Sequence, residues 1–257
     1  LPIGADEGEL RKKIARQLGV PERAVGEARM VRQSVDARRK DQIHLVCTVQ
    51  AAVEDEPRVL RRAKGQVRAV ERAEYRFPAV TRQSAHRPVI VGMGPAGLFC
   101  ALYLARAGVP SVVLERGKPV EERTRDVEHF WRTGELDETS NVQFGEGGAG
   151  TFSDGKLTTG THDGRINTVL ETLVAHGAPE DVRWSHKPHI GTDVLREVVR
   201  RVREELIDLG CDVRFGHKLT GLQSDGARLT GVTVTGPEGV YELETDAAVL
   251  AIGHSPR

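Results

Sequence analysis

A glycine-rich turn between a short apolar run and a helical pattern constrains this chain more than any other feature. The turn, residues 92–97, is Gly-Met-Gly-Pro-Ala-Gly and directly follows the apolar residues 88–91. In such a turn the first glycine permits a tight bend, the second lets the backbone approach a pyrophosphate, and the third lets helix and strand pack closely. Alone the fingerprint is a weak indication, but here a buried strand precedes it and a helix over 95–107 follows it.

The helix after the turn and the acid after the next strand both suit a dinucleotide. Pro95 fits the first helical turn, where its missing N–H costs nothing, and the free N–H groups there attract phosphates. The second apolar run, residues 111–115, ends at Glu115, where an acid accepts hydrogen bonds from ribose hydroxyls. Its charge repels a 2′-phosphate, which disfavours NADP. A turn without a ligand is the alternative, but strand, turn, helix, strand and acid all favour a site for ADP.

Charge balance and cysteine usage argue against several classes of protein. Lys plus Arg and Asp plus Glu are 37 each, and a zero balance argues against bulk nucleic-acid binding. No apolar run approaches the roughly 20 residues that a membrane span needs. Cys47, Cys100 and Cys211 form no Cys-x-x-Cys pair. We therefore expect a reducing, cytoplasmic location, no disulfide framework and no dithiol–flavin disulfide reductase.

The first part of the chain is predicted to be a small α+β domain, residues 1–85, with a linker over 78–88. Its expected order is a helix at 8–18, strands at 28–34 and 43–52, a helix at 54–65 and a strand at 66–77. The charged turn between the first two strands contains Arg38-Arg39-Lys40. This basic turn keeps open a role in docking RNA or a protein partner.

The remaining residues, 86–257, are predicted to form a Rossmann-like FAD/NAD(P)-binding domain with a parallel sheet, which gives an α/β fold class. Expected elements are helices at 120–133, 165–176 and 193–209, a glycine-dense irregular stretch at 141–157, and strands at 211–222, 228–235 and 239–252. On the long helix at 193–209 the basic run, with Arg196, Arg200 and Arg203, is expected to face water. A nucleic-acid surface is the alternative for that run.

Residues 88–97, with residues 115–117, resemble the FAD-binding start of the glutathione-reductase-like flavoproteins. More narrowly, residues 141–157, 187–193 and 247–255 resemble the bacterial uncharacterised FAD-dependent dehydrogenase family. The resemblance implies FAD as the cofactor. Members of that family are longer than this chain, and their fold continues with a strand, a helix and a Gly-Asp turn at the flavin. We therefore expect an N-terminal portion that holds most of the ADP site and part of the flavin site.

The resemblance also implies a set of cofactor-binding residues. Arg116 would lie beside the adenosine, the backbone of Leu219 would meet adenine, and the apolar strand that ends at Gly253 would pass close to the cofactor. The predicted set is Gly92, Gly94, Pro95, Ala96, Gly97, Glu115, Arg116, Gly147, Gly148, Ala149, Gly150, Thr151, Leu219 and Gly253. Bare glycine backbone in the loop 147–151 would permit close approach to the pyrophosphate or the flavin. A mobile surface loop is the alternative.

Lys156 and His189 are the candidates for the substrate or flavin side of the site. A positive group near the flavin's pyrimidine edge would stabilise its anionic reduced form. A salt-bridged lysine and a hydrogen-bonded structural histidine are the alternative. The other histidines, including His129, His162 and His186, show no metal-ligand spacing, so no metal site is predicted.

These features predict an FAD-dependent oxidoreductase of the dehydrogenase type. It would act on an unidentified small molecule and take electrons from NAD(P)H or another donor. One alternative is a nucleotide-sensing module whose N-terminal domain docks RNA or protein. Another is a related fold that binds and consumes NAD, which the loop at 145–157 disfavours. Neither nucleic acid nor a membrane is expected as a partner of the oxidoreductase.

Overall fold

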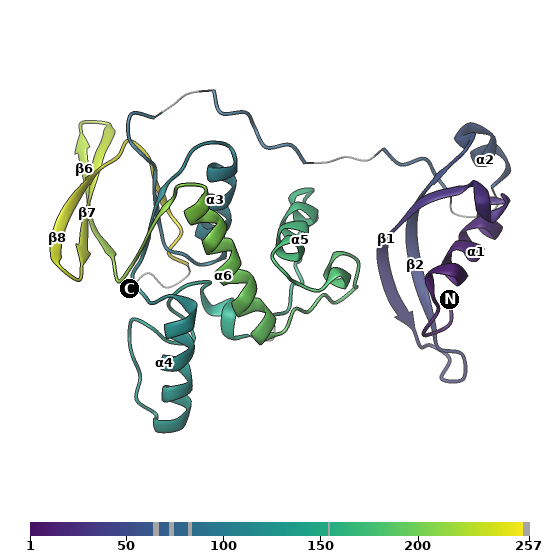
Figure 1. The fold of residues 1–257 in the computed structure, drawn as a ribbon, viewed down its shortest axis with the longest axis horizontal. Helices are drawn as coiled ribbons and strands as arrows, with labels where there is room; N and C mark the ends of the chain where they lie inside the picture. Colours follow the sequence, from purple (N-terminus) through teal and green to yellow (C-terminus); the bar gives the residue numbers. More distant parts are fainter. Residues whose placement is uncertain (64–66, 72–74, 82–83, 154, 254–257) are drawn as a thin grey trace. The chain divides into compact units, whose positions relative to one another are not determined.

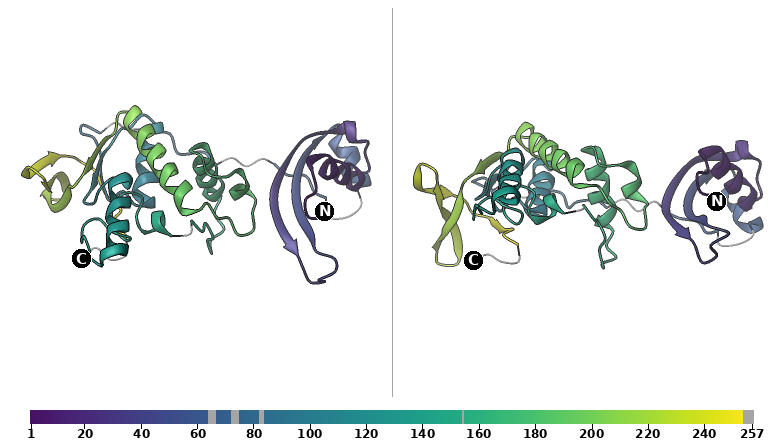
Figure 2. Two further views of the ribbon diagram at one scale, coloured as in Figure 1. Left: turned by 60° about the horizontal axis from the view of Figure 1, so that its bottom comes forward. Right: turned by 90° about the horizontal axis from the view of Figure 1, so that it is seen from below.

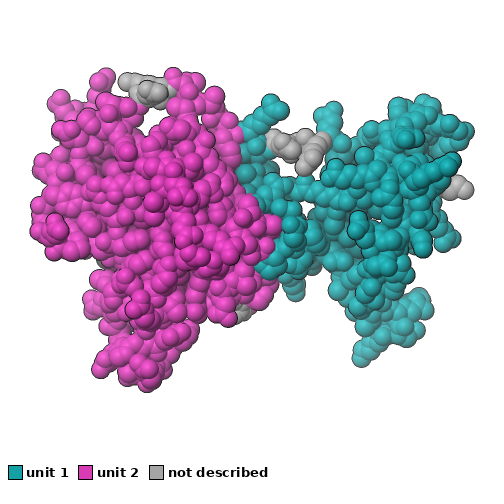
Figure 3. Space-filling view, in the orientation of Figure 1, with its two compact units in different colours: residues 1–76, 157–171, 179–188 teal, residues 77–156, 172–178, 189–257 magenta. Residues whose placement is uncertain are grey.

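The computed structural model describes residues 1–63, 67–71, 75–81, 84–153 and 155–253 (Figure 1; further views in Figure 2). These residues divide into two compact units, coloured separately in Figure 3. The first unit comprises residues 1–76, 157–171 and 179–188, and the second comprises residues 77–156, 172–178 and 189–257. The predicted domain boundary between residues 85 and 86 stays a prediction.

The first unit is built on a two-stranded antiparallel hairpin. Strand β1 (Val25–Asp36) pairs with β2 (His44–Val53). Helices α1 (Glu7–Leu18) and α2 (Glu56–Arg62) lie on the same face of this hairpin (Figures 1 and 2). The segment 184–186 pairs with the free edge of β1, since the N–H of Gln33 donates to the carbonyl of Trp184 at 2.8 Å. Both helices and both strands of this unit lie close to their predicted positions.

The strand predicted at 66–77 does not form in the described part of that segment. Residues 67–71 and 75–77 have no strand, and positions 66 and 72–74 lie outside the described residues. Apolar and charged side chains alternate only weakly along this segment, so pairing it into a sheet would leave it without a consistently apolar face. Apart from the short 3-10 helix at Glu22–Ala24, the described part of residues 1–85 therefore has the order helix, strand, strand, helix.

The second unit contains the predicted parallel sheet. Its four strands have the order β5 (Asp212–Phe215), β4 (Val112–Glu115), β3 (Val89–Val91) and β9 (Ala248–Leu250). All three neighbouring pairs are parallel. Because the carboxyl ends of parallel strands meet at one edge, the glycine turn after β3 and Glu115 at the end of β4 lie side by side there.

Helices cover one face of this sheet and a second sheet covers the other (Figure 1). Helices α3 (Pro95–Arg106) and α6 (Thr192–Asp208) pack on the first face. The buried side chains of this layer are Ile90, Met93, Leu98, Leu102, Val113, Val202 and Leu206. On the other face β6 (Lys218–Asp225), β7 (Arg228–Gly236) and β8 (Gly239–Glu244) form an antiparallel sheet, whose Val232 and Val234 pack on Val89, Val91, Val112 and Leu114.

Residues 211–253 form five strands where the sequence predicted three over 211–252. The predicted strand 211–222 is broken at Gly216, which has a φ of +74°. The predicted strand 239–252 is broken near the buried Thr245, whose hydroxyl donates to the carbonyl of Arg87 at 3.0 Å. In both cases one half joins the parallel sheet and the other joins the antiparallel sheet. A change of sheet requires a bend that the hydrophobic pattern did not mark.

The remaining helices complete the described elements. Helix α4 spans Val120–Thr133, as predicted, and α5 spans Arg165–Ala175, with its residues shared between the two units. Short 3-10 helices span Glu22–Ala24, Ala149–Phe152 and Glu180–Arg183. In the part of the chain that the structure describes, no helix is both long enough and apolar enough to cross a membrane.

Candidate cofactor site

Close packing of backbone shapes the glycine turn. Gly92 has a φ of +99°, and a Cβ there would lie 2.5 Å from the carbonyl oxygen of Ala251, just past β9. A Cβ on Gly97 would lie 1.9 Å from the carbonyl oxygen of Gly92. At Gly94, by contrast, the nearest heavy atom would be 3.9 Å away. The outer two glycines therefore close the turn against its neighbours, and the middle one leaves open space in front of it.

The N-terminus of α3 begins beside that space, at Gly94. Gly94 is the N-cap residue and makes no side-chain capping bond, while Pro95 and Ala96 in the first turn are exposed. A helix N-terminus without a side-chain cap presents N–H groups and positive partial charge to an anion. This arrangement can bind a phosphate group through backbone alone.

Glu115 joins the turns that follow β3 and β4. Its carboxylate is 6 % exposed and accepts two hydrogen bonds of 2.8 Å, from the N–H groups of Met93 and Gly117. Each carboxylate oxygen retains a further lone pair that a ribose hydroxyl can use. Glu115 therefore has a structural role beyond the predicted one, since it holds the glycine turn in place.

The structure brings the glycine-dense loop against the glycine turn. The N–H of Gly147 donates to the carbonyl of Met93 at 2.8 Å. A Cβ on Gly148 would lie 3.2 Å from the Cα of Gly94. Gly147 and Thr151 are buried, whereas Ala149 is exposed and Gly150 is half-buried. The loop is thus packed at the carboxyl edge of the sheet, and two segments that the sequence marked separately are neighbours.

Arg123 holds this loop from inside, and the sequence analysis missed it. Its side chain is fully buried and donates to the carbonyls of Asn141 at 2.8 Å, Val142 at 3.0 Å and Glu146 at 2.5 Å. Its guanidinium also lies 4.7 Å from the centre of the Phe152 ring. Burial lowers the pKa of Arg123 to about 10. A signal existed in the sequence, because Arg123 falls on the apolar stripe of α4, three residues after Val120 and four before Val127.

A second buried charge, Glu146, links this loop to two helices. One oxygen of its carboxylate accepts from the N–H of Val120 at 2.6 Å and from Arg203 at 2.7 Å. The other oxygen is buried without a hydrogen-bond partner in the described structure. Burial raises the pKa of Glu146 to about 7, although the Arg203 guanidinium acts in the opposite direction. The expectation that Arg203 faces water was wrong: its side chain is only 12 % exposed, because it pairs with Glu146 and Glu121.

Three more predicted residues lie near the carboxyl edge of the sheet. The guanidinium of Arg116, directly after β4, lies 4.1 Å from the centre of the Phe144 ring. Exposed Gly253 follows β9, whose Leu250 is paired with Val91, and the predicted residues 254 and 255 lie outside the described ones. The backbone of Leu219 is paired with Val234 in the antiparallel sheet. Two residues earlier, the N–H of His217 donates to the carbonyl of Glu115 at 3.0 Å. This bond brings the start of β6 to the carboxyl edge of the parallel sheet.

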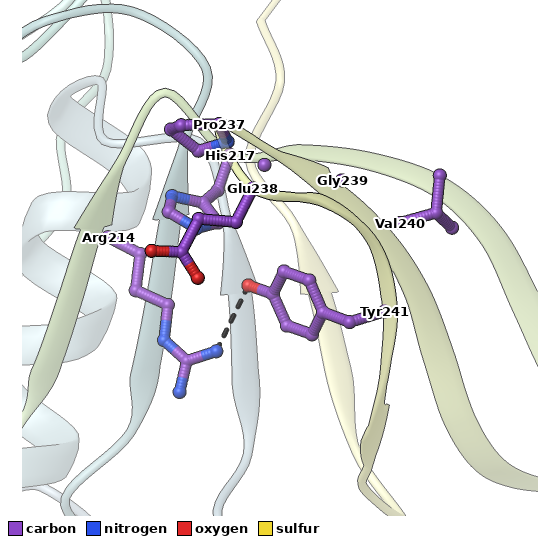
Figure 4. A pocket seen from close by; sticks show the side chains of 8 residues that line it. Arg214, His217, Pro237, Glu238, Gly239, Val240 and Tyr241 are labelled. Atoms are coloured by element: carbon purple, nitrogen blue, oxygen red, sulfur yellow. Dashed lines mark hydrogen bonds between the residues drawn. The ribbon is translucent and has the colours of Figure 1, made fainter.

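An open pocket of about 600 Å³ lies beside the end of β5 (Figure 4). Arg214, His217 and Tyr241 face it together, and the guanidinium of Arg214 donates to the Tyr241 hydroxyl at 3.0 Å. Two further nitrogens of Arg214, Nε and Nη2, donate to the same oxygen of Asp212, at 3.0 and 2.6 Å. None of its lining residues belongs to the glycine turn or to the loop 147–151.

Lys156 and His189 come together in a short antiparallel bridge, and both side chains are exposed. The neighbouring pair supports this bridge, since the N–H of Ile190 donates to the carbonyl of Gly155 at 3.0 Å. Their proposed place beside the flavin stays a prediction. Among the described residues, no group of three or more His, Cys, Asp or Glu side chains could hold a metal ion.

Comparison with known proteins identifies the family of the second part of the chain. Residues 87–249 match the FAD binding domain family, and residues 1–52 match a domain of unknown function, DUF8436. The chain belongs to the FAD-binding domain family. FAD is therefore the cofactor of this domain, and the mixed α/β fold with a parallel sheet is the one predicted. The matches confirm an FAD-dependent flavoprotein but do not single out the glutathione-reductase-like group.

Two curated relatives and one solved structure illustrate the similarity. An uncharacterised protein of Clostridium beijerinckii is 40 % identical over 259 residues, which cover 100 % of this chain and 48 % of the relative. An anhydrotetracycline monooxygenase of Streptomyces rimosus is 30 % identical over 159 residues, which cover 61 % of this chain and 28 % of that enzyme. The structure of an anhydrotetracycline hydroxylase from Streptomyces rimosus matches with 24 % identity and a TM-score of 0.38, over 65 % of this chain and 32 % of that one. The chain spans about half or less of the length of these curated relatives.

The residues of the FAD-binding domain suit the ADP half of its cofactor. The glycine turn and the glycine-dense loop approach so closely that a Cβ on Gly148 would lie 3.2 Å from both the Cα of Gly94 and the ring of Pro95. In front of them lies an uncapped helix N-terminus, and beside them a carboxylate at the end of the next strand. Bare backbone, a helix dipole and a carboxylate match pyrophosphate and ribose, the two polar parts of ADP.

Proposed function

We propose that this chain supplies the ADP-binding half of an FAD-dependent oxidoreductase. The hydrogen bond from the N–H of Gly147 to the carbonyl of Met93, at 2.8 Å, carries the proposal. It holds two stretches of bare backbone together at the carboxyl edge of a parallel sheet, which is where ligands of such folds bind. A surface loop without a ligand to cover would not be expected to pack against the glycine turn.

Each predicted residue has a part in this proposal. The backbone around Gly94, Pro95, Ala96 and Gly97 would bind the pyrophosphate, and Gly92 would shape the turn. The loop Gly147, Gly148, Ala149, Gly150 and Thr151 would cover the phosphates from the other side. Glu115 would hold the ribose, Arg116 and the backbone of Leu219 would meet the adenosine, and Gly253 would let β9 pass close to the cofactor.

When bound, FAD supplies the transfer of two electrons between a donor and a substrate. The residues of this chain bind and orient it: backbone donors fix the phosphates, and Glu115 fixes the ribose. We propose NAD(P)H or another reductant as the electron donor and a small molecule as the substrate. Because the thiols of Cys47, Cys100 and Cys211 are free, we also propose a cytoplasmic location.

Two classes of reaction fit an oxidoreductase of this kind. The sequence predicted a dehydrogenase, whereas curated relatives with a named activity are FAD-dependent monooxygenases, at 30 % and 26 % identity. We therefore favour hydroxylation over dehydrogenation. The two differ in the use of dioxygen, since only a monooxygenase places one of its atoms in the product.

Cofactor binding is tested first on the 257-residue chain. The absorbance spectrum of the purified protein and the mass of the ligand released on denaturation are expected to identify FAD. A colourless protein that takes up neither added FAD nor ADP would contradict the proposed site. The reaction class is then tested on FAD-loaded protein at the length of the curated relatives. Incorporation of one oxygen atom from labelled dioxygen into the product would support hydroxylation. Oxidation of the substrate by an artificial electron acceptor, without dioxygen, would support dehydrogenation.

The docking alternative is tested through the first unit. Its basic turn keeps Arg39 and Lys40 exposed, while Arg38 pairs with Asp36 at 2.5 Å. RNA affinity measured across a salt series is expected to be negligible if the oxidoreductase proposal is sufficient. A steep loss of RNA affinity with rising salt would instead favour a nucleic-acid role.

A further inference from the structure

We propose that Arg123 is a positioning residue for the FAD pyrophosphate, which shapes the covering loop and supplies a buried positive charge beneath it. The inference rests on the proposed place of the pyrophosphate between the glycine turn and the loop 147–151. It adds a residue from α4 that belongs to neither segment. No cofactor-binding role for this arginine follows from the glycine fingerprint.

The side chain of Arg123 sets the path of the irregular loop 141–147. All three nitrogens of the Arg123 guanidinium donate to carbonyls of that loop, at Asn141, Val142 and Glu146. A Cβ on Gly145 would lie 2.6 Å from the Cδ of Arg123. The backbone of Gly145, with a φ of +113°, and its contact with the arginine both favour glycine at this position. A rigid planar fork with several donors suits this task, and lysine would not reproduce it.

Arg123 is also connected to the glycine turn through a single peptide group, the one between Glu146 and Gly147. Arg123 binds the carbonyl of Glu146, and the N–H of the same peptide group, at Gly147, donates to the carbonyl of Met93. A peptide group is planar and rigid. The guanidinium therefore fixes the plane through which the loop meets the turn. Without this side chain the Glu146 carbonyl would keep the 3.3 Å bond from the Thr151 hydroxyl but lose its shorter partner, and the loop over the phosphates would loosen.

Arg123 also brings a positive charge into the interior. Within the described residues, its guanidinium has no carboxylate in direct contact, and its donors go to carbonyl oxygens. The carboxylates of Glu115 and Glu146 act on it at longer range and offset part of its charge. Glu146 is shared with Arg203, at 2.7 Å. A pyrophosphate brings negative charge to the neighbouring loop, and charges interact more strongly in a protein interior than in water.

The test compares ligands with and without phosphate on matched variants of the full chain. Arg123→Met removes the charge and the hydrogen bonds, and Arg123→Lys keeps the charge alone. The control is Arg125→Met, which removes the same charge from an exposed site on the same helix. Dissociation constants of ADP and adenosine are measured by calorimetry, together with thermal unfolding.

The wild-type chain and Arg125→Met are expected to bind ADP alike. In Arg123→Met the dissociation constant of ADP is expected to rise about tenfold or more, while that of adenosine changes by less than about threefold. Arg123→Lys is expected to recover part of the preference for ADP. If Arg123→Met does not fold, Arg123→Lys is used in its place. The affinity of Arg123→Lys for ADP relative to adenosine is expected to fall about threefold.

Three results would overturn the inference. Equal ADP affinity in Arg123→Met and the wild type would show that the arginine does not act on the phosphates. Loss of ADP and adenosine affinity by the same factor would show a general loosening of the fold. If the wild-type chain does not bind ADP, the proposed function itself is wrong. This outcome is distinguishable, because none of the variants then shows ADP binding in calorimetry either.

Discussion

The backbone N–H of Gly147 donates a 2.8 Å hydrogen bond to the carbonyl oxygen of Met93, and this contact joins the two glycine segments of the chain. The peptide group before Met93 is held too, since the N–H of Met93 donates to the carboxylate of Glu115. The turn is thus fixed between a loop and a neighbouring strand. Substitutions around this contact give four predictions.

Gly148→Ala is expected to weaken ADP binding about tenfold or more. Gly148 has a φ of +65°, and a Cβ there would press against Gly94 and Pro95 at 3.2 Å, so the loop must move away from the turn. Gly134→Ala is the matched control, because Gly134 has a similar φ of +79°, lies outside the proposed site, and a Cβ there meets nothing within 4 Å. Calorimetric titration with ADP measures both. Equal affinities in the two variants would show that the loop does not cover the nucleotide.

Gly97→Ala and Gly94→Ala are expected to separate stability from binding. A Cβ at Gly97 would lie 1.9 Å from the carbonyl oxygen of Gly92, so Gly97→Ala should cost about 3 kcal/mol or more of unfolding free energy. At Gly94 the nearest atom is 3.9 Å away, so the methyl group should cost only about 1 kcal/mol or less yet occupy the space for the phosphates. Urea denaturation and ADP titration measure the two effects. A stable Gly94→Ala chain that binds ADP normally would contradict this assignment.

Glu115→Ala is expected to lower both stability and nucleotide affinity. It leaves the N–H groups of Met93 and Gly117 without their acceptor in a buried place, which should cost about 1–3 kcal/mol. Adenosine affinity should fall as well, because the ribose loses its proposed partner. Glu122→Ala on the exposed face of α4 is the control. Unchanged adenosine affinity in Glu115→Ala would limit this residue to its structural role.

The pH dependence of stability is expected to report on Glu146. Burial raises its pKa to about 7 in the folded chain, above the usual value near 4.5, so the folded state holds a proton that the unfolded state releases. Its contribution to the unfolding free energy is therefore present below about pH 4.5 and is lost as pH rises to about 7, at up to about 1.4 kcal/mol per pH unit. Glu146→Gln should remove this slope. Urea denaturation of both proteins between about pH 5 and 8 measures the difference. Parallel curves would mean that Glu146 is already ionised at low pH through its pairing with Arg203.

Local patterns predicted most elements of the fold. Helix α4 begins and ends where its periodicity predicted, and the strand, turn and helix around residues 89–106 lie as expected. The strand expected at 66–77 failed in its described part, and the breaks at Gly216 and Thr245 were missed. Those errors share a cause: membership of a strand in one sheet or another depends on partners distant in the sequence.

The sequence by itself determined the glycine turn, the acid that follows it and the apolar strands between them, because each depends on the spacing of neighbouring residues. Only the tertiary structure decided that Gly147 meets Met93, that Arg123 is buried beneath the loop, and that Arg203 turns inward to Glu146. Helical periodicity identifies which face of a helix is apolar. It does not identify the distant carbonyl or carboxylate that allows a charged side chain to be buried on that face.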